Sequence, residues 1–264
     1  MVKARQELGQ HWLNDLAALK TIVDVGEIQP NDTVLEIGPG LGSLTKLLVE
    51  KAGKVIAIEK DEKLARNLLH HTSLIPEDGP PKGELEVVEG DILEFDLQQL
   101  PRDYKIVANI PYYLTSNLIR LISESPNPPS WMVLLVQKEV AQRLAAKPGQ
   151  MSLLAVSAQA YWQIELGQVV PAELFEPPPK IDSQIVVFQR RQQPLFEDLD
   201  YQKFFRLVKA GFSERRKMLR SSLSAGLGIS KNQAEALLST AKIRADLRAQ
   251  TLSLEDWYRL YSLV

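Results

Sequence analysis

The sequence contains no cysteine and only three histidines in 264 residues. Without cysteine the chain forms no disulfides and no thiolate metal sites, which leaves His11, His70 and His71 as its imidazole ligands. It also has no apolar run near the roughly 18 residues that a membrane span requires, and no apolar signal-peptide core follows Met1. We therefore expect a cytoplasmic monomer with no metal and no membrane partner.

An excess of charge of one sign is missing too, because the formal net charge is only -2. This value neither predicts nor excludes a nucleic-acid partner, since a local basic face can coexist with a neutral total. The hydrophobic content of 45% is enough for a core, and the length suits one large α/β domain with a small appendage. Strand and helix patterns alternate up to residue 190. They start with a helical pattern that places Leu16, Leu19, Ile22 and Val23 on one face, and they include a polar, proline-rich loop at 76–83. After residue 190 only helical signals follow, and there Ser230 with Gln233 and Ser253 with Asp256 have the spacing of capping boxes. We expect a domain boundary there, between residues 1–190 and 191–264.

The stretch from Lys105 to Tyr113 combines a buried strand with an abrupt polar and aromatic end, Asn109-Ile110-Pro111-Tyr112. Strands of parallel α/β sheets deliver ligand-binding groups at their carboxyl ends. The Asn109 side-chain oxygen and the carbonyls next to Pro111 can accept hydrogen bonds from an exocyclic amine, while Tyr112 can stack on the ring that carries it. These residues predict a catalytic site for a planar base with an amino group. The alternative is a strand followed by an ordinary proline turn.

A glycine-rich turn, Gly38-Pro39-Gly40-Leu41-Gly42, lies between an earlier strand and a helix. Glycines there let the backbone approach a ligand closely, and the helix offers unpaired N–H groups. The spacing G-x-G-x-G differs from the dinucleotide pattern G-x-G-x-x-G, which disfavours a nicotinamide enzyme. Glu59 ends the next strand some twenty residues on, where nucleotide-binding folds place the group that binds ribose hydroxyls. Alternatively, Glu59 is an exposed residue that caps the helix beginning near Asp61.

Three further features extend this site. Asp91 follows the third strand, where it can accept a hydrogen bond from an adenine amino group. Phe175, next to rigid prolines, is either a second aromatic wall or a phenylalanine that fills the core. The segment from Phe212 to Leu223 is predicted to be a helix dense in positive charge and is the first candidate for phosphate contact. Its basic residues are Arg215, Arg216, Lys217 and Arg220.

Together these features describe a site that holds a nucleoside beside an amino-bearing planar substrate, and S-adenosylmethionine with an adenine substrate fits best. The residues also resemble a known family, the KsgA-type ribosomal RNA adenine dimethyltransferases, which are relatives of the erythromycin-resistance methylases and of mitochondrial transcription factor B. The resemblance runs nearly end to end. It is carried by Gly9–Leu13, Glu36–Gly42, Glu59, Gly90-Asp91, Asn109–Ser116, Gln137–Ala141 and Phe175–Ser183.

The resemblance implies a Rossmann-like class I methyltransferase sheet of about seven strands with helices on both faces, plus a small C-terminal helical domain. Residues 1–190 would form the S-adenosylmethionine-binding catalytic domain and residues 191–264 a helical RNA-binding domain. The implied reaction is dimethylation of two adjacent adenines near the 3′ end of small-subunit ribosomal RNA. Its setting would be a pre-ribosomal small subunit, with a role in small-subunit biogenesis.

The resemblance also implies residue roles. Asn109 and the Pro111 region would bind both the cofactor edge and the target amine, and Tyr112 and Phe175 would sandwich the target adenine. The family commonly has asparagine where this chain has His11. The cofactor-binding positions would be His11, Leu13, Gly38, Gly40, Glu59, Asp91 and Asn109.

Three rival functions remain open. An erythromycin-resistance methylase would use the same site on large-subunit RNA, although Tyr113–Ser116 and the basic segment look more like the KsgA type. A transcription or assembly factor would need no catalysis, and the intact Asn109 and Tyr112 count against that. A protein-glutamine or DNA-adenine methylase usually carries Pro-Pro-Tyr in this motif, so Ile110 counts against that class.

Overall fold

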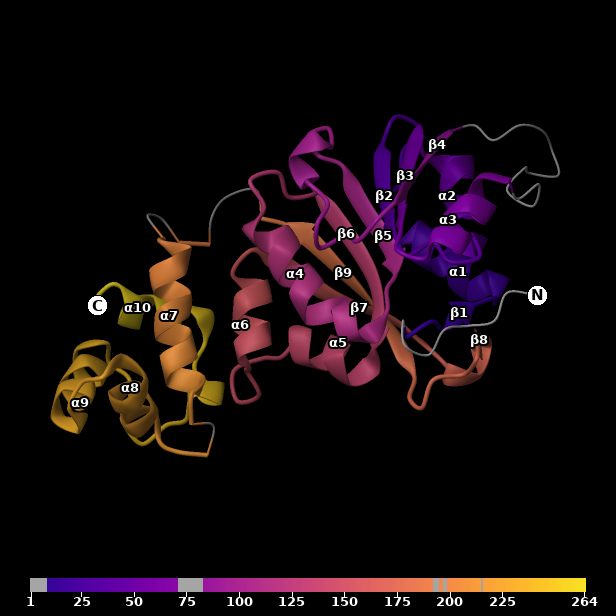
Figure 1. Cartoon of the computed structure of the whole chain (residues 1–264). Helices are drawn as coiled ribbons and strands as arrows, with labels where there is room; N and C mark the ends of the chain where they lie inside the picture. The colour runs from indigo at the N-terminus through magenta and orange to yellow at the C-terminus, as the bar shows by residue number, and fades with distance from the viewer. Residues whose placement is uncertain (1–8, 71–82, 192–194, 197–198, 215) are drawn as a thin grey trace. The chain divides into compact units, whose positions relative to one another are not determined.

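The computed structural model describes residues 9–70, 83–191, 195–196, 199–214 and 216–264 of the chain (Figure 1). The chain divides into two compact units. The first unit contains residues 1–141 and 164–190, and the second contains residues 142–163 and 191–264. No helix in the described residues combines the length and the apolar character needed to cross a bilayer.

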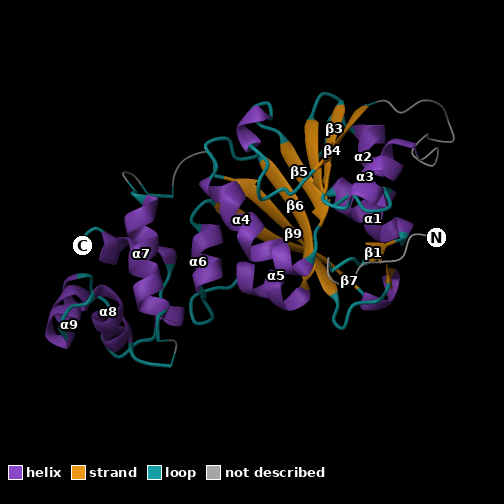
Figure 2. Cartoon of the chain, viewed as in Figure 1, coloured by secondary structure: helices purple, strands orange, loops and turns teal. Residues whose placement is uncertain are grey.

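The described residues form a seven-stranded sheet with the order β4-β3-β2-β5-β6-β9-β7 (Figure 2). The neighbours from β4 to β6 pair in parallel, whereas β9 runs antiparallel to β6. The chain builds outward from β2 to β3 and β4, then returns to place β5 on the other side of β2. The strand succession therefore reverses between β2 and β5. The strands are β2 (Thr33–Ile37), β3 (Lys54–Glu59), β4 (Glu84–Glu89), β5 (Lys105–Asn109), β6 (Trp131–Gln137), β7 (Trp162–Val170) and β9 (Ser183–Arg190).

Helices cover both faces of this sheet, which is why β6 reads as one continuous apolar run. Helices α1 and α2 pack on one face against β-branched side chains such as Val107 and Val133. Met132 and Leu134, which point the other way along β6, have no exposed surface either, and α4 lies in front of the sheet in Figure 2. The helices of this layered part are α1 (Leu16–Asp24), α2 (Ser43–Lys51), α3 (Glu62–His70) and α4 (Thr115–Glu124).

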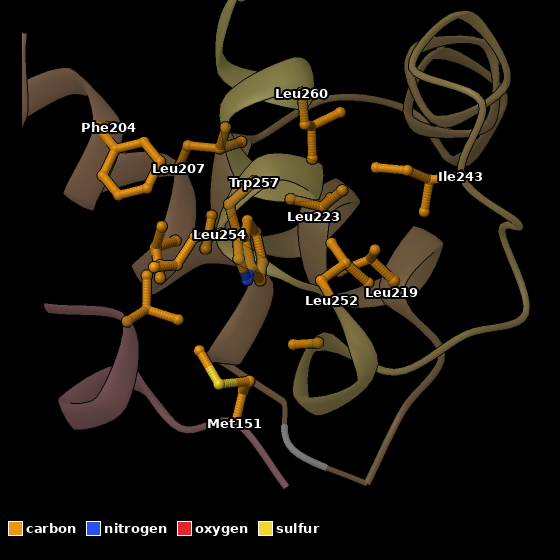
Figure 3. Packing of buried hydrophobic residues seen from close by; sticks show 14 of the residues in the cluster. Met151, Phe204, Leu207, Leu219, Leu223, Ile243, Leu252, Leu254, Trp257 and Leu260 are labelled. Atoms are coloured by element: carbon orange, nitrogen blue, oxygen red, sulfur yellow. The ribbon is translucent and has the colours of Figure 1, made fainter. Parts of the chain in front are cut away.

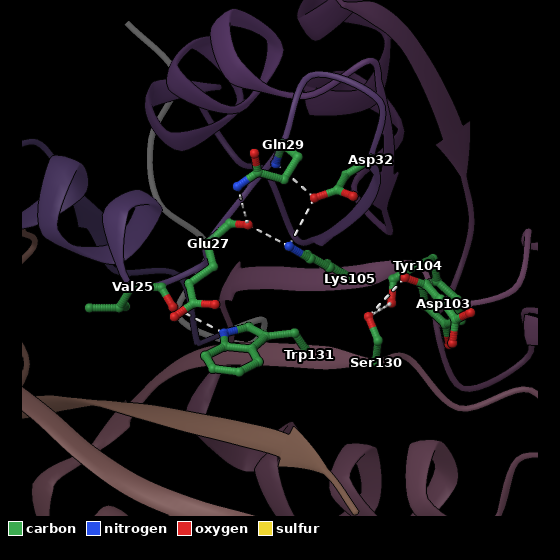
Figure 4. A network of polar contacts seen from close by, with 9 residues as sticks. All are labelled: Val25, Glu27, Gln29, Asp32, Asp103, Tyr104, Lys105, Ser130 and Trp131. Atoms are coloured by element: carbon green, nitrogen blue, oxygen red, sulfur yellow. Dashed lines mark hydrogen bonds and ion pairs between the residues drawn. The ribbon is translucent and has the colours of Figure 1, made fainter. Parts of the chain in front are cut away.

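Polar contacts tie the amino-terminal ends of β5 and β6 to the segment that follows α1 (Figure 4). Lys105 Nζ lies 2.9 Å from Asp32 Oδ2 and also donates to the Glu27 carbonyl. The Trp131 indole donates to the Val25 carbonyl over 3.0 Å. These contacts hold the amino-terminal ends of the strands. The carboxyl ends of the parallel strands lie on the opposite side of the sheet and are left free for a site.

The second unit is helical and has its own core (Figure 3). Trp257 and Phe204 are fully buried there, together with Leu219 and Leu223. Two of its helices begin at capping boxes, in which Ser230 pairs with Gln233 and Ser253 with Asp256, as the sequence predicts. The helices are α6 (Leu153–Gln159), α7 (Tyr201–Phe212), α8 (Leu219–Leu227), α9 (Lys231–Thr240) and α10 (Leu254–Tyr261), while α5 (Lys138–Leu144) crosses the division between the units.

The structure differs from the sequence expectations in three places. Residues 142–163 belong to the second unit rather than with the rest of 1–190, because the apolar side of α6 packs into the helical core. The segment 212–223 is not one helix, since α7 ends at Phe212 and α8 begins at Leu219. Leu16, expected on the buried side of α1, is 54% exposed because it follows the N-cap Asp15 at the helix start. Most of the predicted loop 76–83 lies outside the described residues.

Candidate active site

A pocket of about 170 Å³ lies at the carboxyl ends of β2, β3, β4 and β5. It is bordered by the loops that follow these four strands and by residues 9–13 near the amino terminus. In open α/β sheets, ligands bind where the strand succession reverses. The glycine turn follows β2 and the Asn109–Tyr112 turn follows β5, so the two predicted motifs flank that point. The pocket is also lined by every predicted cofactor residue, namely His11, Leu13, Gly38, Gly40, Glu59, Asp91 and Asn109.

The glycine turn requires its glycines. Gly38 and Gly40 have φ angles of +67° and +57°, in the left-handed region that side chains disfavour. A Cβ atom on Gly40 would also lie 3.1 Å from the Trp12 ring, which is closer than ordinary van der Waals contact. The turn therefore presents bare backbone to the pocket, with Trp12 packed against it.

Glu59 is buried, with 6% exposure, and holds the glycine turn to the end of β3. Its Oε2 accepts a hydrogen bond from the Gly40 N–H over 3.1 Å, and its Oε1 accepts one from the Asp61 N–H over 2.8 Å. Burial raises the pKa of this carboxyl, and the two backbone donors offset part of that rise. The cap of α3 is Asp61, which accepts from the Lys63 N–H, and not Glu59. Each Glu59 oxygen retains a lone pair for a further donor.

Asp91 lies just after β4, and each of its carboxylate oxygens has one partner. Lys60 Nζ lies 2.8 Å from Asp91 Oδ2, and the Leu93 N–H donates to Oδ1 over 3.0 Å. The hydrogen bond from Lys60 lowers the pKa of Asp91, so the carboxylate is ionised at neutral pH and can accept further hydrogen bonds.

Glu36, the last acid of β2 before the glycine turn, also lines the pocket and was not singled out from the sequence. It is 1% exposed, and its Oε2 has no hydrogen-bond partner among the described residues. Burial raises the pKa of Glu36 to about 8, with a smaller lowering by Thr45 and a smaller rise from the charge of Glu59. The only sequence signal for this was an acid inside a strand that is otherwise apolar.

Asn109 has a fixed amide orientation. Its Nδ2 donates to the His11 carbonyl over 3.3 Å, and no described residue donates to its Oδ1. Pro111 follows with φ of −56° and without an N–H, and its own carbonyl accepts from the Leu114 N–H over 3.0 Å, which closes a tight turn. Among these groups, Asn109 Oδ1 is therefore left as an acceptor at the end of β5.

Tyr112 and His11 form a pair of aromatic rings beside Asn109. Their centroids lie 5.7 Å apart and their planes differ by 23°. The Tyr112 hydroxyl lies 2.8 Å from Ser183 Oγ, and His11 Nδ1 lies 2.7 Å from the Pro177 carbonyl. Burial raises the pKa of Tyr112, so its ring stays neutral at neutral pH. Ser183 and Pro177 were inside a motif matched in the sequence, but only Phe175 of that motif was assigned a role.

The structure places Phe175 in the core and not in the pocket lining. Phe175 is 4% exposed, because the short strand β8 (Phe175–Glu176) pairs with β1 (Trp12–Leu13) and turns the ring inward beside Leu13. In this structure Phe175 fills the core, which agrees with the alternative that the sequence left open. Its role as the second aromatic wall stays a prediction.

The residues predicted to contact phosphate lie in the second unit and differ in their exposure and their ion pairs. Arg216 and Lys217 are exposed in the connection between α7 and α8. Arg220 is at the start of α8, where its Nη1 lies 3.1 Å from Glu235 Oε2 on α9. Arg215 lies outside the described residues. In the described residues, no group of three or more His, Asp or Glu side chains is placed to hold a metal ion.

A family model described as ribosomal RNA adenine dimethylase matches residues 1–264. The chain belongs to this family. The resemblance inferred from the sequence motifs is thus confirmed, and with it the adenine dimethylase activity. A ribosomal RNA small subunit methyltransferase A from Dehalococcoides mccartyi is 41% identical over 264 residues, which cover 98% of this chain and 88% of the relative. One from Streptococcus thermophilus is 38% identical over 97% of this chain and 90% of the relative.

Solved structures confirm the methyltransferase fold of this dimethylase. The 23S rRNA methyltransferase ErmE is 29% identical with a TM-score of 0.75, and the match covers 95% of this chain and 98% of that chain. A dimethyladenosine transferase from Plasmodium falciparum is 26% identical with a TM-score of 0.79, and the match covers 95% of this chain and 96% of that one. Both matches extend well beyond the sheet, so the dimethylase shares its helical C-terminal part with them.

Proposed function

We propose that this dimethylase transfers methyl groups from S-adenosylmethionine to the exocyclic amine of two adjacent adenines near the 3′ end of small-subunit ribosomal RNA. The observation that carries the proposal is the orientation of Asn109. Its Nδ2 is committed to the His11 carbonyl, which leaves Oδ1 as an acceptor with no donor from the described residues, on a residue that lines the pocket. An acceptor at this place suits an amine that donates its hydrogens in hydrogen bonds before it reacts.

The residues at the end of β5 raise the nucleophilicity of the amine. An adenine amino lone pair is delocalised into the ring, which keeps the nitrogen planar and unreactive. Two acceptors, Asn109 Oδ1 and the Ile110 carbonyl, would hold both amine hydrogens and favour a near-tetrahedral nitrogen aimed at the methyl donor. Pro111 carries no N–H that would compete for these oxygens. No strong base is needed, because the proton can leave to water after transfer.

The pocket residues fit the methyl donor. Glu59 retains acceptor capacity for the two ribose hydroxyls, Asp91 for the adenine amino group, and the bare backbone of the glycine turn for the methionine part. When bound, the cofactor supplies a methyl group already activated on a sulfonium. His11 and Leu13 border the same space.

The target base must leave its stack to reach Asn109. Extrusion costs a few kcal/mol, and stacking on an aromatic ring returns about 1 to 3 kcal/mol per base. Tyr112 is next to Asn109 in the chain, and Ser183 holds its hydroxyl, so the ring is fixed for such a stack.

Similarity favours small-subunit over large-subunit RNA as the substrate. The small-subunit methyltransferases from D. mccartyi and S. thermophilus are 41% and 38% identical to this chain, whereas the 23S rRNA methyltransferase ErmE is 29% identical. We place the reaction on a pre-ribosomal small subunit in the cytoplasm, by a monomer, with a role in small-subunit biogenesis. The first unit would carry catalysis, and the region 191–264 would contact RNA through Arg215, Arg216, Lys217 and Arg220.

A labelling experiment tests the proposed function. Purified protein and labelled S-adenosylmethionine are incubated separately with unmethylated small subunits, large subunits and duplex DNA, and the modified nucleosides are identified after digestion. Dimethyladenosine from small subunits alone is expected. Label in large-subunit RNA would favour the resistance-methylase class, and no label on any substrate would favour a binding factor.

Replacing Glu59 by glutamine is expected to weaken S-adenosylmethionine binding by at least about tenfold, because hydrogen bonds to a charged acceptor are worth about 1.5 to 3 kcal/mol. Isothermal calorimetry measures the change, and RNA affinity should stay within about twofold. Glu89→Gln is the matched control, since Glu89 is the exposed last residue of the neighbouring strand β4 and does not line the pocket. Unchanged cofactor affinity in folded Glu59→Gln would show that Glu59 does not bind the cofactor.

Reversing the charge of Arg216 and Lys217 to glutamate is expected to weaken RNA binding and to flatten its salt dependence. The slope of log K against log salt should fall by about 0.7 to 0.9 for each phosphate that the variant no longer neutralises. The control is the double variant Lys20→Glu and Lys63→Glu, which makes the same charge change at exposed positions of α1 and α3. Equal slopes for wild type and the Arg216 and Lys217 variant would show that these two residues are part of a solvated surface and do not contact phosphate.

A further inference from the structure

The pocket lining includes an exposed aromatic ring to which the proposed function gives no role. Tyr113 lines the pocket and is 60% exposed, so its ring lies at the mouth and not inside. Leu93, which lines the same pocket, is 39% exposed. Exposed apolar surface beside a pocket is typical of a binding site. The mouth therefore suits a ligand that extends beyond the pocket itself.

The turn after β5 directs two consecutive tyrosines to different places. Residues Tyr112–Leu114 form a 3-10 helix, in which successive side chains point about 120° apart. The Tyr112 hydroxyl lies 2.8 Å from Ser183 Oγ, which is fully buried. The Tyr113 ring instead rests against Gly9, because a Cβ atom on Gly9 would lie 3.4 Å from its Cδ1. Tyr113 is thus supported along one edge while most of its surface stays open to solvent.

We propose that Tyr113 is the stacking platform for the nucleotide next to the target adenine. The enzyme would then hold two consecutive bases, one inside the pocket beside Asn109 and one at its mouth. This assignment rests on the proposed function and adds a second base contact to it.

Extrusion of the target adenine supplies the ligand for such a platform. A base that leaves its stack uncovers one face of each base that neighbours it. A neighbour is joined to the target through a single phosphate, so it stays near the mouth when the target reaches the pocket. Stacking on an aromatic ring strengthens binding by about 5- to 150-fold per base and tolerates any base. Such tolerance suits a substrate with two adjacent target adenines, because the base left at the mouth differs between the two reactions.

The charges beside Tyr113 favour a base over a phosphate at this place. Among the described residues that line the pocket, Lys60 is the one lysine or arginine, and its Nζ lies 2.8 Å from Asp91 Oδ2. The hydrogen bond to Asp91 is the largest cause of the raised pKa of Lys60, and the smaller causes include Tyr113 and Glu94. Lys60 is therefore already neutralised by a carboxylate. The group at the mouth that can recognise RNA is the aromatic ring.

Three substitutions at Tyr113 separate the ring from its hydroxyl and from its bulk. Tyr113→Phe keeps the ring without the hydroxyl, Tyr113→Leu keeps apolar bulk without the ring, and Tyr113→Ala removes both. Leu166→Ala is the control, since Leu166 is 42% exposed on β7 and does not line the pocket. The measurements are the small-subunit concentration that gives half the maximal single-turnover methylation rate, and the calorimetric Kd for S-adenosylmethionine without RNA.

If the ring is a platform, the half-saturating concentration rises about tenfold in Tyr113→Ala and about fivefold in Tyr113→Leu. It stays within about twofold in Tyr113→Phe and in Leu166→Ala. The cofactor Kd stays within about twofold in all four variants, and Tm stays close to the wild-type value because both positions are exposed.

Four other outcomes overturn the assignment. A raised cofactor Kd in Tyr113→Ala would make the ring a cover over the cofactor. A Tyr113→Phe variant as weak as Tyr113→Ala would make the hydroxyl the functional group. Wild-type behaviour of Tyr113→Leu would show that apolar bulk is enough, and wild-type behaviour of Tyr113→Ala would show that the ring does not bind RNA. Absence of dimethyladenosine from small subunits treated with the wild type would instead overturn the proposed function itself.

Discussion

Replacing Asn109 by alanine is expected to lower the single-turnover rate of methyl transfer by about ten- to a thousandfold, with the fold intact. The lower bound corresponds to the removal of one hydrogen bond of about 1.4 kcal/mol from the transition state. The upper bound is the effect of removing a preorganised polar group from a water-excluded site. Asn109 Oδ1 belongs to this second kind, because its amide is held by the His11 carbonyl before substrate arrives.

The measurement is methylation of unmethylated small subunits at saturating cofactor, with Tm recorded for each variant. Asn127→Ala is the matched control. Asn127 is 5% exposed and donates to the carbonyls of Leu97 and Leu100, away from the pocket lining. We expect this control to lower Tm and to keep the rate within about threefold. A folded Asn109→Ala protein with near-normal turnover would contradict the catalytic assignment.

The free energy of unfolding is expected to fall as pH rises from about 5 to about 8, and Glu36 is expected to cause most of that fall. The pKa of Glu36 is about 8 in the folded protein against an ordinary value of 4.5. Between these values the folded state keeps a proton that the unfolded state releases, so stability decreases with increasing pH. Below pH 4.5 the loss is absent, and above pH 8 it is complete. At about 1.4 kcal/mol per pH unit, the difference amounts to about 4 to 5 kcal/mol.

Urea unfolding of wild type and Glu36→Gln at several pH values measures this effect. The glutamine variant is neutral throughout, so it should gain stability over wild type as pH rises toward 8. A shallower decline should remain, because burial also raises the pKa of Glu59 and the sign is the same. Glu89→Gln, at an exposed position, should follow wild type. A flat wild-type profile between pH 5 and pH 8 would mean that Glu36 is ionised in the folded protein.

Local patterns in the sequence were sufficient for most elements of the fold. The strands β3 and β5 end at Glu59 and Asn109 as predicted, since an apolar run gives way to polar and turn-forming residues at each place. The capping boxes at Ser230 and Ser253 were readable for the same reason, because both partners of each box lie within four residues. The segment between Phe212 and Leu219 was misread, since dense positive charge does not by itself reveal where a helix stops.

The candidate site was predictable to the extent that strand ends define it. Parallel strands deliver their carboxyl ends to one edge, so the positions of Glu59, Asp91 and Asn109 in the sequence are enough to predict that they line one pocket. Their hydrogen bonds were not predictable. That Glu59 holds the Gly40 N–H and Asp91 meets Lys60 depends on how the loops pack.

The sequence by itself determined the family, the order of the motifs along the chain and the chemistry of the residues at the strand ends. These three features depend on short-range pattern and residue type. The tertiary structure alone decided that Phe175 is in the core, that His11 faces Tyr112 and that burial raises the pKa of Glu36. Each of these depends on segments far apart in the chain. His11 and Pro177, for example, are 166 positions apart and meet only because β1 pairs with β8 in one register. Burial and register arise from packing of the whole unit, which no local stretch of sequence contains.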